Sequence, residues 1–293
     1  MKKIFRYRNW IQAVSALAAN AYIPGFIKGS IYTGPGKNIC VPGLNCYSCP
    51  GALGSCPIGS LQAVASGTRH NFSFYVLGTL MLFGVLLGRF ICGFLCPVGW
   101  FQQLIHKIPT KKLQIPKKAD QKLRLFKYLI LVLFVLAFPA FIVDAYGMGS
   151  PWFCKWICPA GTLEGGIPLV LSNESLRMNL GFTFWWKMFL LAAAVAGSLF
   201  IYRPFCKYIC PLGAIYALFN RFSLTRMELD SDSCITCGKC VRSCPMQVDV
   251  LKNINSAECI RCGKCAEACP IGAIDLKFGK ITLKKNDISS EKA

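Results

Sequence analysis

Eight cysteines near the C-terminus follow one spacing twice. The chain reads C-I-T-C-G-K-C-V-R-S-C-P from Cys234 and C-I-R-C-G-K-C-A-E-A-C-P from Cys259. Thiolates are soft ligands that suit iron–sulfur clusters, and a [4Fe–4S] cluster needs four of them. Three closely spaced cysteines can wrap one cluster, whereas the fourth lies too far round the turn and ligates the other cluster. The doubled spacing C-x2-C-x2-C-x3-C-P therefore predicts two [4Fe–4S] clusters.

The crossing pattern assigns each of these cysteines to a cluster. We expect the first cluster to be held by Cys234, Cys237, Cys240 and Cys269, and the second by Cys259, Cys262, Cys265 and Cys244. Gly238 and Gly263 lack a Cβ, so the backbone can pass close to the cluster sulfurs. A zinc site or disulfides are the alternatives, but zinc sites usually pair two C-x2-C units.

A second cysteine repeat lies upstream. The pattern C-x3-C-P-x-G occurs at residues 92–99, 154–161 and 206–213, each time at or just after the end of an apolar stretch. Cysteines at i and i+4 lie on one face of a helical turn, which the proline ends or bends. Buried free cysteine is also a good small hydrophobic residue, so a structural role is the alternative. Three copies with the same proline and glycine favour a metal role.

The composition indicates a membrane protein with a small soluble appendage. Only 16% of the 293 residues are charged, 54% are hydrophobic and the mean hydropathy is +0.45, whereas soluble proteins are about 25% charged. Apolar stretches cover residues 10–27, 72–87, 125–143 and 182–201. For the first, a retained signal anchor is preferred over a cleaved signal peptide.

We therefore expect an α-helical membrane protein with about four transmembrane helices and a C-terminal α+β domain. Residues 1–226 form the transmembrane domain, 227–283 a two-cluster bacterial-type ferredoxin domain and 284–293 a polar tail. Of the basic residues near the apolar stretches, 17 fall in loops on one side and 5 on the other. The positive-inside rule then places both termini and the ferredoxin domain in the cytoplasm, and it explains the net charge of +20 without nucleic acid.

This topology sorts the remaining cysteines by side. An inner-face cluster is expected from Cys92, Cys96, Cys206 and Cys210. The outer side receives six cysteines, of which four could hold one further cluster: Cys40, Cys46, Cys49, Cys56, Cys154 and Cys158. The resulting hypothesis is a chain of four [4Fe–4S] clusters.

With both motifs established, the chain resembles the membrane-bound polyferredoxins of the NapH and NosR type. The resemblance covers roughly residues 72–275 and rests on the cysteine pairs before Pro97, Pro159 and Pro211 and on the eight ferredoxin cysteines. It implies quinol oxidation or respiratory electron transfer. The chain departs from the family in its third C-x3-C-P motif and in the cysteines of residues 40–56, and it lacks room for the flavin-binding domain of NosR. A flavin would therefore lie on a partner.

The preferred function is electron transfer between a cytoplasmic donor or the quinone pool and a membrane or outer-face redox partner. The chain would act as a subunit of an oxidoreductase complex, such as a quinol dehydrogenase, with a flavoprotein or cytochrome as partner. The alternatives are a copper reductase or assembly factor and an iron–sulfur redox sensor. No C-x-x-C-H motif or strand-linked G-x-G-x-x-G occurs, so neither c-type haem nor NAD is expected.

Overall fold

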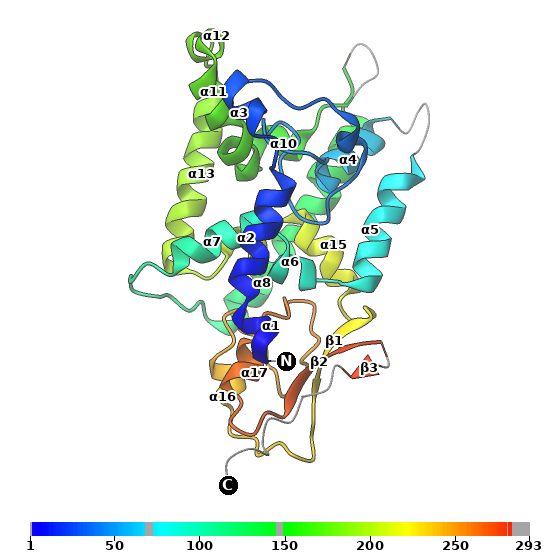
Figure 1. Ribbon diagram of the computed structural model, residues 1–293, viewed down its shortest axis with the longest axis vertical. Helices are drawn as coiled ribbons and strands as arrows, with labels where there is room; N and C mark the ends of the chain where they lie inside the picture. Colours follow the sequence, from blue (N-terminus) through cyan, green and yellow to red (C-terminus); the bar gives the residue numbers. More distant parts are fainter. Residues whose placement is uncertain (1, 68–72, 145–148, 280, 283–293) are drawn as a thin grey trace.

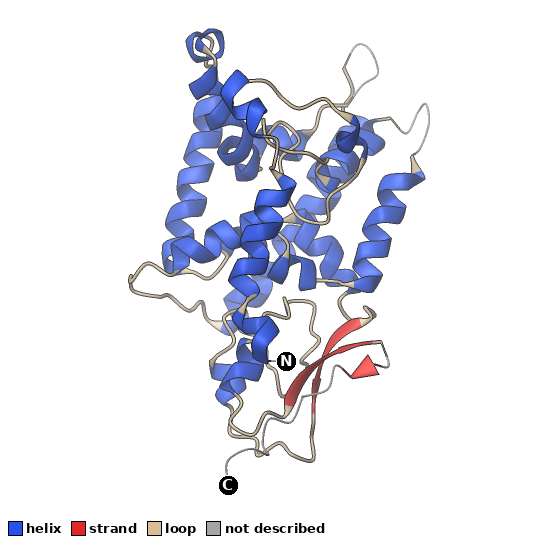
Figure 2. Cartoon of the chain, viewed as in Figure 1, coloured by secondary structure: helices blue, strands red, loops and turns tan. Residues whose placement is uncertain are grey.

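Helices dominate the computed structural model, which describes residues 2–67, 73–144, 149–279 and 281–282. Figure 1 shows a helical part and, at its lower end, a small domain that carries the strands. Figure 2 shows that the described strands are confined to this small domain. The expected polar tail, residues 284–293, lies outside the described residues.

The helical part contains many short helices and two long helical segments, residues 117–141 and 182–200. In chain order its helices are α1 (Lys2–Arg6), α2 (Arg8–Ala19), α3 (Ile23–Lys28), η1 (Pro35–Asn38), α4 (Pro57–Ser66), α5 (Phe74–Leu86), α6 (Phe90–Phe94), α7 (Pro97–His106), α8 (Lys117–Ile130), η2 (Leu131–Ala137), α9 (Phe138–Phe141), α10 (Trp152–Trp156), η3 (Gly161–Gly166), α11 (Ile167–Ser172), α12 (Glu174–Met178), α13 (Phe182–Phe200), α14 (Pro204–Tyr208) and α15 (Pro211–Phe219).

Two helices in the described part of the chain are long and apolar enough to cross a membrane. One runs from Lys117 to Phe141 through α8, the π-helical η2 and α9, and the other is α13. Only 28% and 11% of their most apolar windows are buried within the protein. Exposed apolar surface of this length suits contact with lipid hydrocarbon, which is about 30 Å thick.

The other two expected spans are shorter than predicted. The first stretch breaks at Asn20, because α2 ends at Ala19 and its 12 residues are followed by a separate six-residue helix, α3. The Asn20 amide donates to Ala16 O and Asn45 Oδ1 and so ties the break to a cysteine-bearing loop. Helix α5 has 13 residues. At 1.5 Å per residue it is about 20 Å long, less than the hydrocarbon core.

The small domain is built from a three-stranded antiparallel sheet and two short helices. Its elements are β1 (Thr225–Leu229), α16 (Lys239–Arg242), α17 (Lys264–Ala268), β2 (Ile274–Phe278) and β3 (Ile281–Thr282). Strand β2 pairs with both others, and α16 packs against α17. Gly238 and Gly263 precede these helices with φ of 70° and 78°. A side chain at Gly263 would also collide with the Phe5 ring of α1, so glycine is needed there for two reasons.

Candidate metal centres

The cysteines of the small domain gather in the two sets that their spacing predicts. One cavity is lined by Cys234, Cys237, Cys240 and Cys269, and another by Cys244, Cys259, Cys262 and Cys265. The crossing cysteines have matching environments: Val248 N–H donates to Cys244 Sγ, and Ala273 N–H to Cys269 Sγ, both at 3.4 Å. The donor sets thus fit two clusters that exchange their fourth ligand.

The cysteines are present as thiols, and a bound cluster would favour their ionisation. All 18 cysteines are free. Within the described residues, no three Cys, His, Asp or Glu side chains lie close enough together to bind one metal ion. Burial raises the pKa of Cys259 to about 12, so without a metal this thiol keeps its proton at neutral pH. A bound cluster supplies the positive charge that ionises such thiols, and it holds them apart at its four corners.

The cysteines predicted for the inner face also come together, and we call them the proximal set because they lie next to the small domain. They are Cys92, Cys96, Cys206 and Cys210, and each is at most 9% exposed. Cys92 and Cys206 lie on the short helices α6 and α14, and Cys96 and Cys210 cap the N-termini of α7 and α15. A helix N-terminus carries partial positive charge, which stabilises an anionic cluster.

Two buried arginines complete the proximal set. Arg203 Nη1 donates to Cys92 O at 2.6 Å, and Arg89 Nη2 donates to Cys206 O at 3.4 Å, so each motif is held by the arginine of the other. Both side chains are fully buried. Their Nε–H groups have no acceptor among the described residues. Buried donors normally have a partner, and the sulfur atoms of a cluster between these thiols would provide acceptors.

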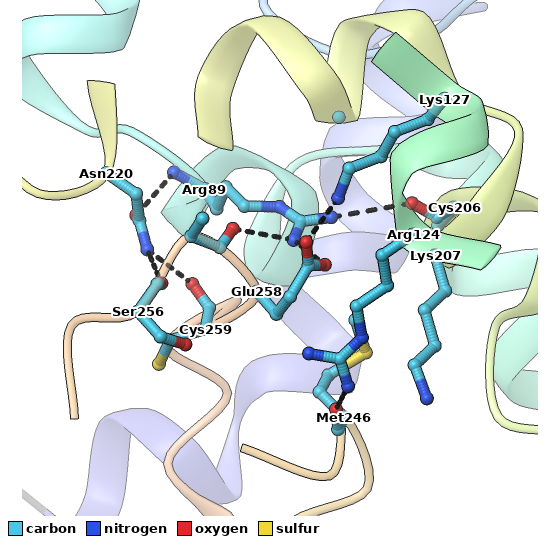
Figure 3. A network of polar contacts seen from close by, with 12 residues as sticks. Arg89, Arg124, Lys127, Cys206, Lys207, Asn220, Met246, Ser256, Glu258 and Cys259 are labelled. Carbon is cyan, nitrogen blue, oxygen red and sulfur yellow. Dashed lines mark hydrogen bonds and ion pairs between the residues drawn. The ribbon is translucent and has the colours of Figure 1, made fainter. Parts of the chain in front are cut away.

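A polar network joins the proximal set to the small domain (Figure 3). Glu258, next to Cys259, accepts hydrogen bonds from Arg89 Nη1 at 2.7 Å and Lys127 Nζ at 2.5 Å. Asn220 Nδ2 donates to Cys259 O at 3.0 Å and, in turn, Asn220 Oδ1 accepts from Arg89 N. Burial alone would raise the pKa of Glu258, but the two cations lower it to about 2. Glu258 therefore stays ionised and holds the two cysteine sets together.

Four of the six cysteines predicted for the outer face line one cavity of about 660 Å³, and we call them the distal set: Cys46, Cys56, Cys154 and Cys158. The other two, Cys40 and Cys49, are buried but do not line this cavity. Glu164 Oε2 accepts from Cys46 N at 2.6 Å. Burial raises the pKa of Glu164 to about 7. Burial and, to a smaller extent, the negative charge of Glu164 raise the pKa of the Cys46 thiol to about 11.

A short stretch of chain links the distal and proximal sets. A Cβ on Gly43 would lie 3.1 Å from Cys96 Cα, so the loop that carries Cys46 passes directly over the proximal set. Tyr216 of α15 donates to Pro42 O at 2.8 Å and anchors this loop. All four proximal cysteines and three distal ones, Cys56, Cys154 and Cys158, belong to or pack against one buried hydrophobic cluster, which keeps water away from the region between the sets.

Sequence reasoning placed the cysteines but missed the polar residues around them. Arg89 and Arg203 each precede a C-x3-C-P-x-G motif by three residues, a shared position that could have revealed them. The residue six positions after the second cysteine is the other missed signal, being Gln102 after Cys96 and Glu164 after Cys158. Their contacts join segments about a hundred residues apart, and spacing does not report such contacts.

Comparison with known proteins gives the same class. A model described as a 4Fe–4S binding domain matches residues 70–116, 130–168 and 183–229, and one described as a 4Fe–4S dicluster domain matches residues 226–270. The uncharacterised protein MJ0749 of Methanocaldococcus jannaschii is 30% identical over 204 residues, which are 68% of each chain. No solved structure matches the chain.

Two further relatives carry informative names. YccM of Escherichia coli K12, an electron transport protein by name, is 29% identical over 192 residues, 63% of this chain and 49% of YccM. The methylamine utilization ferredoxin-type protein MauN of Paracoccus denitrificans is 31% identical over 180 residues, 58% of this chain and 54% of MauN. The chain belongs to the family of 4Fe–4S binding polyferredoxins that includes these proteins and NosR, and the predicted resemblance is confirmed. It is a [4Fe–4S] ferredoxin-type electron transport protein.

Proposed function

We propose that this protein carries electrons between a cytoplasmic donor, or the quinone pool, and a redox partner within or beyond the membrane. The route runs from the small domain to the proximal set. The observation that carries the proposal is the contact of Arg89 with both Cys206 O and Glu258, next to Cys259. It brings a ligand motif of the small domain against a ligand motif of the helical part. Clusters supply one-electron redox chemistry when bound, and the protein fixes their order and surroundings.

The membrane setting supports the same route. The two candidate spans, Lys117–Phe141 and α13, expose most of their apolar surface. The small domain and the chain's N-terminus lie at the same end of the molecule (Figure 1), the end to which the basic loops assign the cytoplasm. A multi-pass arrangement that includes α2 and α5 would need partner helices or a locally thinned bilayer, since both helices are short.

A copper reductase and a redox sensor remain the alternative functions, and nothing in the described structure favours either. The proposed route also implies partners, because the chain needs a donor and an acceptor. A flavoprotein or cytochrome subunit would suit these roles.

Iron content tests the proposal. Anaerobically purified protein should contain at least about 12 iron atoms per chain, because each of three [4Fe–4S] clusters holds four. Cys206→Ser should remove about four of them and leave the EPR signals of the two small-domain clusters intact. About eight irons in the unaltered protein would overturn the route through the proximal set.

A further inference from the structure

We propose that the distal set is a fourth [4Fe–4S] site built as a structural duplicate of the proximal set, with Gln62 and Gln102 as equivalent positioning residues. This inference rests on the proposed function, because it takes the proximal set as a cluster site. It commits to Cys46, Cys56, Cys154 and Cys158 as ligands. The family models match residues from 70 onward, so they include neither Cys46 nor Cys56.

The first observation is a fourth copy of the helix-capping motif. Cys56, Cys96 and Cys210 are N-caps with nearly the same backbone angles, φ/ψ of −70°/125°, −78°/118° and −66°/114°. Each is followed by proline as the first helical residue, where the missing N–H costs nothing. Cys56 begins C-P-I-G, so it is the second cysteine of a motif whose first cysteine is spaced differently.

The second observation is a pair of matching side-chain contacts. Gln102 of α7 donates from Nε2 to Cys206 Sγ at 3.1 Å and accepts at Oε1 from Phe205 N at 3.2 Å. Gln62 of α4 donates from Nε2 to Cys154 Sγ at 3.1 Å and accepts at Oε1 from Phe153 N at 3.0 Å. Each glutamine follows the capping cysteine of its own motif by six residues.

In each set, the glutamine contact brings two cysteine motifs face to face. In the proximal set, the motif of Cys96 faces the motif of Cys206. In the distal set, the motif of Cys56 faces the motif of Cys154. An amide held at both ends fixes the rotamer of the first cysteine of the facing motif and places a donor on its sulfur. Such donors stabilise the more negative, reduced cluster.

The third observation selects Cys46 among the loop cysteines. Glu164 follows Cys158 by six residues, as Gln62 follows Cys56. Its carboxylate accepts from Cys46 N, and it therefore reaches the facing motif at Cys46. Unlike the two glutamines, Glu164 contacts the backbone N–H of the cysteine itself, and this contact together with the cavity lining favours Cys46 as the first cysteine. Cys40 and Cys49 do not line the cavity that the four distal cysteines share.

Substitutions of single cysteines test the ligand set in the full chain, purified anaerobically. Cys46→Ser and Cys56→Ser should each lower the iron content by about four per chain, whereas Cys49→Ser and Cys40→Ser should leave it unchanged. Loss of iron in Cys49→Ser but not in Cys46→Ser would overturn the assignment. So would unchanged iron in both Cys46→Ser and Cys56→Ser. A retained small-domain EPR signal shows that each variant has folded.

Redox titration of the glutamine variants tests their positioning role. Gln62→Leu should keep its iron, while the distal reduction equilibrium shifts about tenfold against reduction, about 59 mV. Gln102→Leu should do the same to the proximal site alone. Gln62→Glu cannot donate a hydrogen bond to Cys154 Sγ when it is ionised, so its distal potential should be as low as that of Gln62→Leu. Gln62→His keeps a donor, so its distal potential should lie between those of Gln62→Leu and the unaltered protein. A shift of neither potential would overturn the positioning role.

The iron contents of two variants distinguish failure of the proposed function from failure of the distal site alone. If Cys206→Ser and Cys56→Ser both leave the iron unchanged, the proposed function fails. If only Cys206→Ser lowers it, the route ends at the proximal set and the duplicate site alone is refuted.

Discussion

The proximal and distal cysteine sets share one scaffold but differ in the charges around it. In both, a proline-led helix begins at a cysteine and its glutamine contacts the facing motif. The proximal set is enclosed by two fully buried arginines. The distal set has Glu164 and Lys187 nearby and opens onto a cavity of about 660 Å³. The shared helix starts position the thiols of both sets. The neighbouring charged residues and the cavity determine the local charge and the access of solvent to each set.

This difference suggests a division of labour between the two sets. Positive charge near a cluster stabilises its reduced form, so the buried arginines would raise the potential of a cluster held by the proximal set. Arg89 is paired with Glu258, whereas Arg203 has no acidic partner in the described part of the chain. In the proposed route the proximal set would exchange electrons with the small domain, and the distal set would exchange them with whatever enters its cavity.

The largest expected effect comes from removing one ligand from each set. Cys206→Ala should prevent the distal cluster from being reduced through the small domain, because the intermediate cluster is lost. Cys158→Ala should leave the proximal cluster fully reducible. Rapid-freeze EPR after mixing with a reduced ferredoxin donor distinguishes the two. Equal reduction of the distal cluster in both the unaltered protein and Cys206→Ala would contradict the serial order.

The second prediction concerns the attachment of the small domain at the proximal side. Glu258→Gln leaves Arg89 and Lys127 without their shared counter-charge, and breaking a buried ion pair costs about 3–5 kcal/mol. Protease release or hydrogen exchange of the small domain measures this loss. The matched control is Glu228→Gln, since the Glu228–Lys277 pair is partly exposed at the surface and contributes about 1 kcal/mol or less. Similar losses in both variants would refute the role of Glu258.

The stabilisation that Glu258 provides through Arg89 and Lys127 depends on pH in a defined way. The native pKa of Glu258, about 2, lies below the ordinary value of 4.5. Its stabilisation is therefore fully present above about pH 4.5 and is lost as the pH falls toward 2. The Glu258 contribution to the hydrogen-exchange protection factors of the small domain should be constant from pH 8 to pH 5, once the pH dependence of intrinsic exchange is removed, and Glu258→Gln should lower these factors throughout that range. Normal protection in Glu258→Gln at pH 7 would contradict this assignment.

Spacing alone grouped the small-domain cysteines as the two cavities do, because the contacts among Cys234, Cys237 and Cys240 are local. It also grouped the proximal cysteines, because the apolar stretches set their side. It did not separate Cys46, which lines the distal cavity, from Cys49, which does not, and the contact of Cys46 with Glu164 joins residues 118 positions apart in the chain. The first stretch was expected to be longer because hydropathy does not report that Asn20 turns inward to Asn45. Helix α5 ends at Leu86, two residues before Gly88, which has a φ of 52°.

The third prediction addresses the charge difference between the sets. Arg203→Gln removes a buried cation from the proximal set and should lower its potential by about 60 mV, a tenfold change for one electron. The distal potential should shift less, because the Coulomb interaction with the removed charge falls with distance. Arg221→Gln, at an exposed arginine, provides the control for net charge. Equal shifts of both potentials would show that the arginine does not distinguish the two sets.

The smallest expected effect concerns access to the distal cavity. Ser60 lines the cavity on α4, so Ser60→Phe should narrow it and slow oxidation of the distal cluster by ferricyanide a few-fold. The proximal cluster is enclosed by buried side chains, and its direct oxidation should not change. Ser175→Phe on the exposed helix α12 provides the matched control. An unchanged rate of distal-cluster oxidation in Ser60→Phe, with the cluster intact, would show that electrons leave by a route other than this cavity. The two sets would then differ in charge alone.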